Sequence, residues 1–250
     1  MLSAIRWTWL ARGLGLTVRT LRKVRLYFLG MFLSLFLPST IGGDVARGYL
    51  LARGRDGAGW AAAASVILER ANGVVALTAL ATGCMFWLDL PRQWWVIWMV
   101  SVSAMWLGML TYPFWHRRLP GLLKHWQSLP IDQPSFHAAW WKSLPMSALF
   151  QTLVVEAHVI LGQAAGLEMP WAAYGVMVCL VALASAVPIS FNGFGIREAG
   201  YVGLAAYFGG SADAAAVMAA LWVVVLAVTA LPGAWVLWQL GGAPALKEKS

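Results

Sequence analysis

Charged residues inside apolar segments are the side chains of this 250-residue sequence best suited to chemistry. Glu69 and Arg70 lie about ten residues inside one apolar stretch, and Glu156 is about as deep in another. A charge at the centre of a bilayer costs at least ~2.5–3.5 kcal/mol, so each one requires a partner or water. Structural ion pairs, such as Glu69 with Arg197 or Asp44 with Arg70, are one explanation. Taken together, the set favours a polar cavity for a charged headgroup, lined by Asp44, Arg47, Glu69, Arg70, Glu156, Arg197 and Glu198.

Two similar stretches rich in proline and glycine accompany these charges. Residues 37–47 and 187–198 each run from an apolar segment through a proline and small polar residues to two glycines and then charges. Broken helices at membrane depth persist only where they are buried or line a wet cavity, and paired breaks in corresponding halves indicate an inverted repeat. Ordinary loops between helices are the alternative. The predicted breaks are Pro38, Gly42, Gly43, Pro188, Asn192, Gly193 and Gly195.

The composition excludes most soluble classes of protein. Hydrophobic residues make up 60% and charged residues 11% of the chain, against roughly 25% charged in soluble domains. Cys84 and Cys179 lie in apolar runs, and with four scattered histidines they offer no metal-ligand spacing. Neither a nucleophile–base constellation nor a phosphate-binding glycine loop is present, so we expect no enzyme, cofactor or metal. The net charge of +8 indicates membrane orientation and not nucleic-acid binding.

The hydropathy pattern predicts an all-α polytopic membrane protein with a single membrane domain. About four segments are long enough to span: a helix pair within 60–115 (60–88 and 93–115), then 138–166, where Pro145 is a candidate start, and 212–240. Two other segments, 26–51 and 171–209, are broken and predict re-entrant hairpins. Residues 1–25 are basic and rich in tryptophan, which is typical of an interfacial segment, and 116–137 form a polar loop.

The distribution of lysine and arginine predicts the orientation. Fifteen of the 18 basic residues fall in 1–25, 47–59, 116–142 and 241–250, whereas the turns on the opposite side contain only Arg92. Since basic loops remain in the cytoplasm, both termini are predicted to be cytoplasmic. With the loops on these sides, each of the two hairpins must return to the side of the membrane from which it entered.

Three stretches resemble the signature motifs of a known family. They are Pro38–Arg47 (PSTIGGDVAR), Leu68–Gly73 (LERANG) and Pro188–Glu198 (PISFNGFGIRE). In order and spacing they look like the lysylphosphatidylglycerol synthase transmembrane family, the flippase-like membrane domain of multiple peptide resistance factors, and the resemblance covers nearly the whole chain. It implies a bacterial or archaeal plasma-membrane (inner-membrane) protein that binds or moves phospholipids or polyprenyl-phosphate-linked lipids. The matching charged residues are Asp44, Arg47, Glu69, Arg70, Arg197 and Glu198.

The sequence departs from this family in two respects. It contains no aminoacyl-transferase domain, so lysyl transfer is not expected, and it begins later than members with helices before the basic stretch at Ile5–Arg25. The predicted function is translocation of a lipid with a phosphate-bearing headgroup. The alternatives are a membrane-embedded enzyme acting on a lipid-linked substrate, and a non-catalytic scaffold whose partner is an envelope glycosyltransferase.

Overall fold

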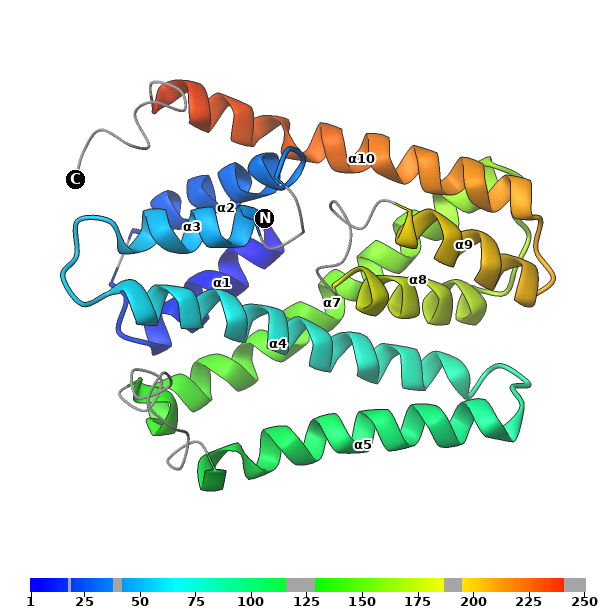
Figure 1. Ribbon diagram of the computed structural model, residues 1–250, viewed down its shortest axis with the longest axis horizontal. Coiled ribbons are helices and arrows are strands. Elements are labelled where there is room, and N and C mark those ends of the chain that lie inside the picture. The colour runs from blue at the N-terminus through cyan, green and yellow to red at the C-terminus, as the bar shows by residue number, and fades with distance from the viewer. Residues whose placement is uncertain (18, 38–41, 116–128, 187–194, 241–250) are drawn as a thin grey trace.

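The computed structural model describes residues 1–17, 19–37, 42–115, 129–186 and 195–240. These residues form nine α-helices and one short 3-10 helix and contain no strand, which confirms the all-α prediction for this part of the chain (Figure 1). The helices are α1 (Leu2–Gly13), α2 (Thr20–Ser34), α3 (Gly42–Ala52), α4 (Gly59–Met85), α5 (Arg92–Trp115), α7 (Pro134–Ala164), α8 (Trp171–Ser185), α9 (Ile196–Tyr207) and α10 (Ala212–Gln239), with the 3-10 helix η3 at Pro130–Asp132.

Within the described ranges, three helices are long and apolar enough to cross a membrane. They are α4, α7 and α10, which correspond to three of the four predicted spans. The fourth predicted span, 93–115, coincides with the 24-residue α5, which is not among these three. Helix α7 begins at Pro134 and continues through Pro145, so Pro145 is not the start of this helix.

Helix α1 differs from the expectation for residues 1–25. It packs against α4 and α7, and Arg6 and Trp7 are buried between these helices. The Trp7 indole N–H donates to Ser65 Oγ at 3.0 Å. At the start of α2, the buried Lys23 Nζ donates to the Leu16 carbonyl at 3.1 Å. These polar groups find partners inside the bundle, which the basic pattern of the sequence did not indicate.

Two helical hairpins approach the middle of the molecule from opposite ends. Helices α2 and α3 pack together, as do α8 and α9, and the end of the first helix and the start of the second lie near the centre in both pairs (Figure 1). The single helix α10 contacts both α2 and α9. Of the predicted breaks, Gly42 and Gly43 begin α3, and Gly195 precedes α9 with φ +85°. The others, Pro38, Pro188, Asn192 and Gly193, lie outside the described residues.

Glycines allow the first hairpin to close. A Cβ atom added to Gly43 would collide with the Gly30 carbonyl oxygen and with Ser34 Oγ on α2. On α10, a Cβ atom added to Gly233 would collide with the Phe28 carbonyl oxygen. Small residues at such contacts let helix backbones approach closely, which is a main source of association between membrane helices. The packing of α2 against α3 and α10 therefore depends on these glycines.

Substitution of Gly43 by alanine should destabilise the hairpin. Overpacking of a tight contact costs about 1–3 kcal/mol, so the midpoint of thermal unfolding in detergent should fall by several degrees. Gly83→Ala on α4 is the matched control, because Gly83 is exposed and nothing lies within 4 Å of an added Cβ. If the two variants unfold at the same temperature, the close contact of α2 with α3 is not required for stability.

Candidate functional site

A cavity of about 440 Å³ lies between the two hairpins. Residues from α2, α3, α8 and α9 line it, together with residues from α1, α4, α7 and α10. The cavity therefore joins the two stretches that look alike in sequence. The predicted site residues among its lining are Asp44, Arg47, Glu69, Arg70 and Arg197.

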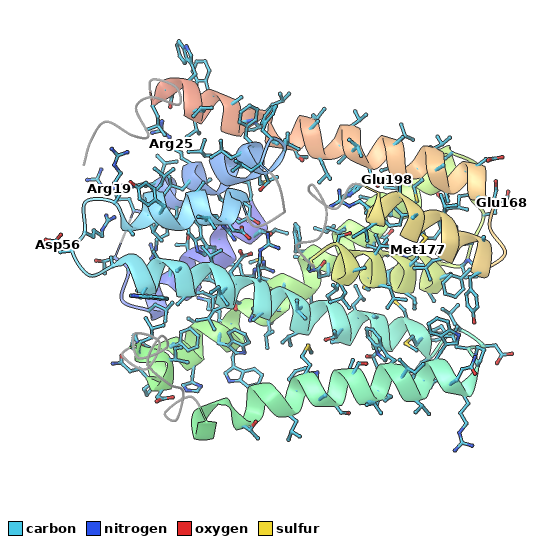
Figure 2. All side chains as sticks on the ribbon, viewed as in Figure 1. Arg19, Arg25, Asp56, Glu168, Met177 and Glu198 are labelled. Atoms are coloured by element: carbon cyan, nitrogen blue, oxygen red, sulfur yellow. The ribbon has the colours of Figure 1, made fainter. Side chains whose placement is uncertain are left out.

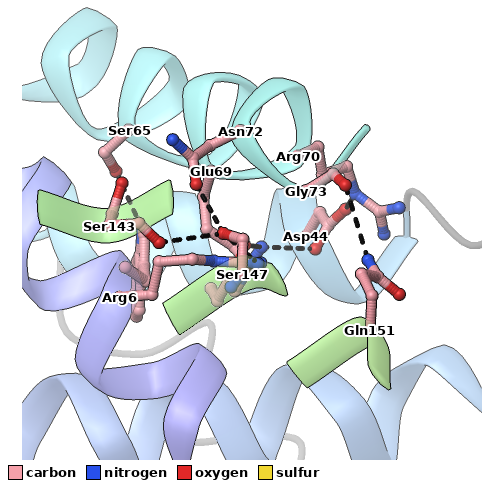
Figure 3. A network of polar contacts seen from close by, with 12 residues as sticks. Arg6, Asp44, Ser65, Glu69, Arg70, Asn72, Gly73, Ser143, Ser147 and Gln151 are labelled. Atoms are coloured by element: carbon pink, nitrogen blue, oxygen red, sulfur yellow. Dashed lines mark hydrogen bonds and ion pairs between the residues drawn. The ribbon is translucent and has the colours of Figure 1, made fainter. Parts of the chain in front are cut away.

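An alternating chain of charges lines this cavity. Figure 3 shows the polar contacts around two of its members, Asp44 and Glu69. Glu69 accepts hydrogen bonds from Arg6 and from Arg47, the latter at 2.5 Å. Asp44 pairs with Arg47 at 3.0 Å and with Arg70. The order is thus Arg70, Asp44, Arg47, Glu69, Arg6, in which each carboxylate lies between two guanidinium groups.

The local helix geometry produces this order. Asp44 and Arg47 are three residues apart on α3, so they share a face of that helix. Asp44 also stands in the first turn of α3, where a negative charge is favourable near the helix N-terminus. Glu69 and Arg70 are adjacent on α4 and point in directions about 100° apart, given 3.6 residues per turn. Glu69 therefore reaches the buried arginines, while Arg70 reaches the outer side of Asp44.

Arg6 is a member of the network that the sequence did not identify. Its Nη1 donates to the Ser147 hydroxyl of α7 at 2.9 Å, and that hydroxyl donates to Asn72 Oδ1 of α4. Between the same two helices, α7 and α4, Gln151 Nε2 donates to the Gly73 carbonyl at 3.5 Å. The segment 1–25 contains several arginines, and only the packing of α1 distinguishes Arg6 from the others.

Aromatic rings fix the guanidinium group of Arg47. It lies over the ring of Trp7 at 4.9 Å and over the ring of Tyr27 at 4.8 Å. Such cation–π contacts are strongest away from water, and the Arg47 side chain is buried. Arg47 is therefore held by ion pairs and by ring faces, with little freedom to move.

Arg197 and a histidine–tyrosine pair also line the cavity. His158 Nδ1 lies 2.8 Å from the Val154 carbonyl oxygen, which only accepts, so this nitrogen carries the proton. His158 Nε2 then accepts from the Tyr201 hydroxyl at 2.8 Å. Tyr201 is four residues after Arg197 on α9. This pair therefore anchors α9 to α7 and helps to position Arg197 beside the cavity.

The other two predicted site residues do not line the cavity. Glu156 Oε1 accepts from the Trp171 indole N–H at 2.8 Å, a contact that joins α7 to the start of α8. The Glu198 carboxylate accepts from the Gly195 backbone N–H at the start of α9. The sequence predicted both side chains in the cavity. In the structure, each instead makes a contact within the helical framework.

The described lining of the cavity has an excess of positive charge. Arg6, Arg47, Arg70 and Arg197 contribute four positive charges, and Asp44 and Glu69 contribute two negative ones, which leaves +2. Two buried polar atoms of the same lining, Ser185 Oγ and Arg47 Nη1, have no hydrogen-bond partner among the described residues. The charged groups of the cavity are therefore suited to an anionic ligand.

A second cavity, of about 260 Å³, lies among α4, α5, α8 and α9. Its lining is almost entirely apolar and aromatic and includes Trp94, Trp98, Leu180 and Phe208. It offers no charged group for a headgroup. Across the described ranges, no three His, Cys, Asp or Glu side chains are grouped so that they could hold a metal ion. The charged cavity is thus the candidate site.

A family model described as "Lysylphosphatidylglycerol synthase TM region" matches residues 1–233. The chain belongs to this family. No curated protein and no solved structure matches it. Membership of the family confirms the resemblance seen in the three motifs, and together with the three apolar helices it identifies a multi-pass membrane protein. The matching model is that of the transmembrane region, and it identifies no catalytic domain.

Replacing Glu69 by glutamine should strongly destabilise the protein. It leaves the buried Arg6 and Arg47 without their shared carboxylate, and breaking a buried ion pair typically costs about 3–5 kcal/mol. Glu156→Gln is the matched control, because its bond to Trp171 is exposed. Thermal unfolding in detergent measures both variants. Equal stability of the two would show that the charge chain does not hold α1, α3 and α4 together.

Proposed function

We propose that this protein binds a lipid with a phosphate-bearing headgroup and moves it across the membrane. The observation that supports this most directly is the cavity of charge +2 between the two hairpins. A phosphodiester brings one negative charge and several strong acceptor oxygens, which is what an excess of guanidinium groups binds best. Both phospholipids and polyprenyl-phosphate-linked lipids carry such a group.

The ends of the hairpin helices add to this preference. Helices α3 and α9 both begin in the middle of the molecule (Figure 1). The N-terminus of a helix carries partial positive charge and free N–H groups, so it favours anions. Arg47 and Arg197, one from each of these helices, line the same cavity. The two halves of the sequence thus contribute equivalent groups to the proposed site.

The arrangement of the hairpins supports translocation in addition to binding. We interpret α2–α3 and α8–α9 as re-entrant hairpins of opposite orientation, whose connecting ends meet at the middle of the membrane. In inverted-repeat transporters, substrate sites lie between such elements, and alternating access comes from rocking one repeat against the other. A headgroup between the hairpins would then be reachable from each side in turn.

Arg197→Ala should abolish lipid binding and translocation while the protein still inserts into the membrane. The experiment identifies lipids that co-purify in mild detergent by mass spectrometry, and then measures translocation of the identified lipid in reconstituted vesicles. Wild-type protein should be enriched in an anionic or polyprenyl-phosphate lipid, and the variant should carry bulk lipid only. Arg92→Ala is the control, because Arg92 begins α5 and is not among the residues lining the cavity.

Other results would favour the alternatives. Identical lipids and transport with Arg197→Ala would indicate that the charges are structural, and a scaffold for an envelope glycosyltransferase would become the better interpretation. A lipid whose covalent mass changes after incubation with the protein would indicate an enzyme.

The proposed orientation places the basic end in the cytoplasm. Arg19, Arg25 and Asp56 lie at one end of the molecule and Glu168 at the other (Figure 2). Single cysteines at Asp56 and Glu168 should report this difference, because the native Cys84 and Cys179 are buried. A membrane-impermeant thiol reagent should label Glu168→Cys in cells with a permeable outer membrane, and Asp56→Cys only after the inner membrane is opened. The reverse pattern would invert the topology.

A further inference from the structure

We propose that Asp44 is a built-in competitor for the anionic ligand. Asp44 pairs with Arg70, and when the ligand binds it yields Arg70 to the phosphate. This inference rests on the proposed function and deepens it, because it names the ion pair that opens and the residue that limits the affinity.

Exposure distinguishes one pair in the charge chain from the rest. The side chains of Arg6, Glu69 and Arg47 are 6%, 3% and 5% exposed. At the other end, the side chain of Arg70 is 44% exposed and that of Asp44 is 13% exposed. The Asp44–Arg70 pair is therefore the part of the chain that an entering ligand and water can reach. Exposed ion pairs are weak, because water and salt compete with them.

The order of charges also determines which pair can open without loss. If Arg70 leaves, Asp44 retains Arg47, and Glu69 retains both Arg47 and Arg6. No buried charge then lacks a partner. Opening the Glu69–Arg6 pair at the other end would instead leave the buried Arg6 without a carboxylate, which is strongly unfavourable. Of the two arginines that end the chain, Arg70 is consequently the one that can exchange.

A phosphate can replace the carboxylate without changing the type of contact. Arg70 and Arg197 both line the cavity, one from α4 and one from α9. A phosphodiester oxygen offers each of them a charged acceptor, as Asp44 offers Arg70 now. The released Asp44 remains next to the cavity on α3 and can take Arg70 back. Binding is thereby kept weak enough for release, which a carrier requires.

This role predicts a gain of affinity from loss of a charge. Asp44→Asn should bind phosphate more tightly than wild type, by roughly two- to fivefold, the range expected when an exposed ion pair no longer competes. Arg70→Gln should bind about tenfold more weakly, because a charge-assisted hydrogen bond is lost. The double variant should bind phosphate as weakly as Arg70→Gln does, because Asp44 acts on the affinity through Arg70. A residue that merely stabilised α3, or contacted the ligand itself, would lose affinity on substitution.

The experiment titrates purified full-length protein in neutral detergent with two probes, dioleoylphosphatidylglycerol and inorganic phosphate, and follows binding by native mass spectrometry. Dioleoylphosphatidylcholine measures non-specific lipid binding. Asp213→Asn and Arg25→Gln are the matched controls, because each changes one exposed charge outside the cavity. Thermal unfolding without ligand checks that each variant is folded. Should Asp44→Asn fail this check, Asp44→Ser replaces it, because serine is also tolerated at the start of a helix.

The outcomes separate this inference from the proposed function. Tighter binding of phosphatidylglycerol by Asp44→Asn, lost in the double variant, supports both. Equal or weaker binding by Asp44→Asn overturns the competitor role and leaves lipid binding intact. If wild type binds phosphatidylglycerol no better than phosphatidylcholine, lipid binding fails. In that case, a higher affinity of Asp44→Asn for inorganic phosphate still supports the exchange at a free-phosphate site. An unchanged affinity for inorganic phosphate overturns both the competitor role and the proposed function.

Discussion

The carboxylate of Glu69 is the group on which the rest of the site depends. It is buried, and it joins Arg6 of α1 to Arg47 of α3 across its own helix, α4. One negative charge shared by two arginines leaves positive charge in excess, and the lower dielectric of the interior strengthens each of these contacts. Burying this carboxylate is favourable only because both arginines are in place. The contacts of Glu69 thus hold three helices together and leave the cavity with a net positive charge.

Much of the fold follows from features visible in the sequence. Long apolar segments predicted α4, α7 and α10, and the paired Pro/Gly stretches predicted breaks where α3 and α9 begin. Hydropathy and helix-breaking residues act locally, so a single sequence reports them well. The burial of α1 was not predicted. Its arginines suggested an interfacial segment. A basic pattern does not reveal that one of these arginines, Arg6, pairs with Glu69 inside the bundle.

The candidate site was only partly predictable for the same reason. The sequence marked seven charged residues, of which Asp44, Arg47, Glu69, Arg70 and Arg197 line one cavity. Glu156 and Glu198 have local contacts with an indole and with a backbone N–H. Depth along a segment can be counted from the sequence. The face on which a side chain lies, and the partner that it meets, depend on tertiary packing.

Helix α10 has a mechanical consequence for the whole molecule. It is continuous from Ala212 to Gln239, and it contacts α9 of one hairpin and α2 of the other. Pro232 interrupts its hydrogen bonding next to Gly233, where the backbone of α2 comes closest. Because α10 packs against a helix of each hairpin, a displacement of one hairpin also moves a helix that contacts the other. Helix α10 thus couples the two hairpins mechanically, and Pro232 marks the point at which this coupling can bend.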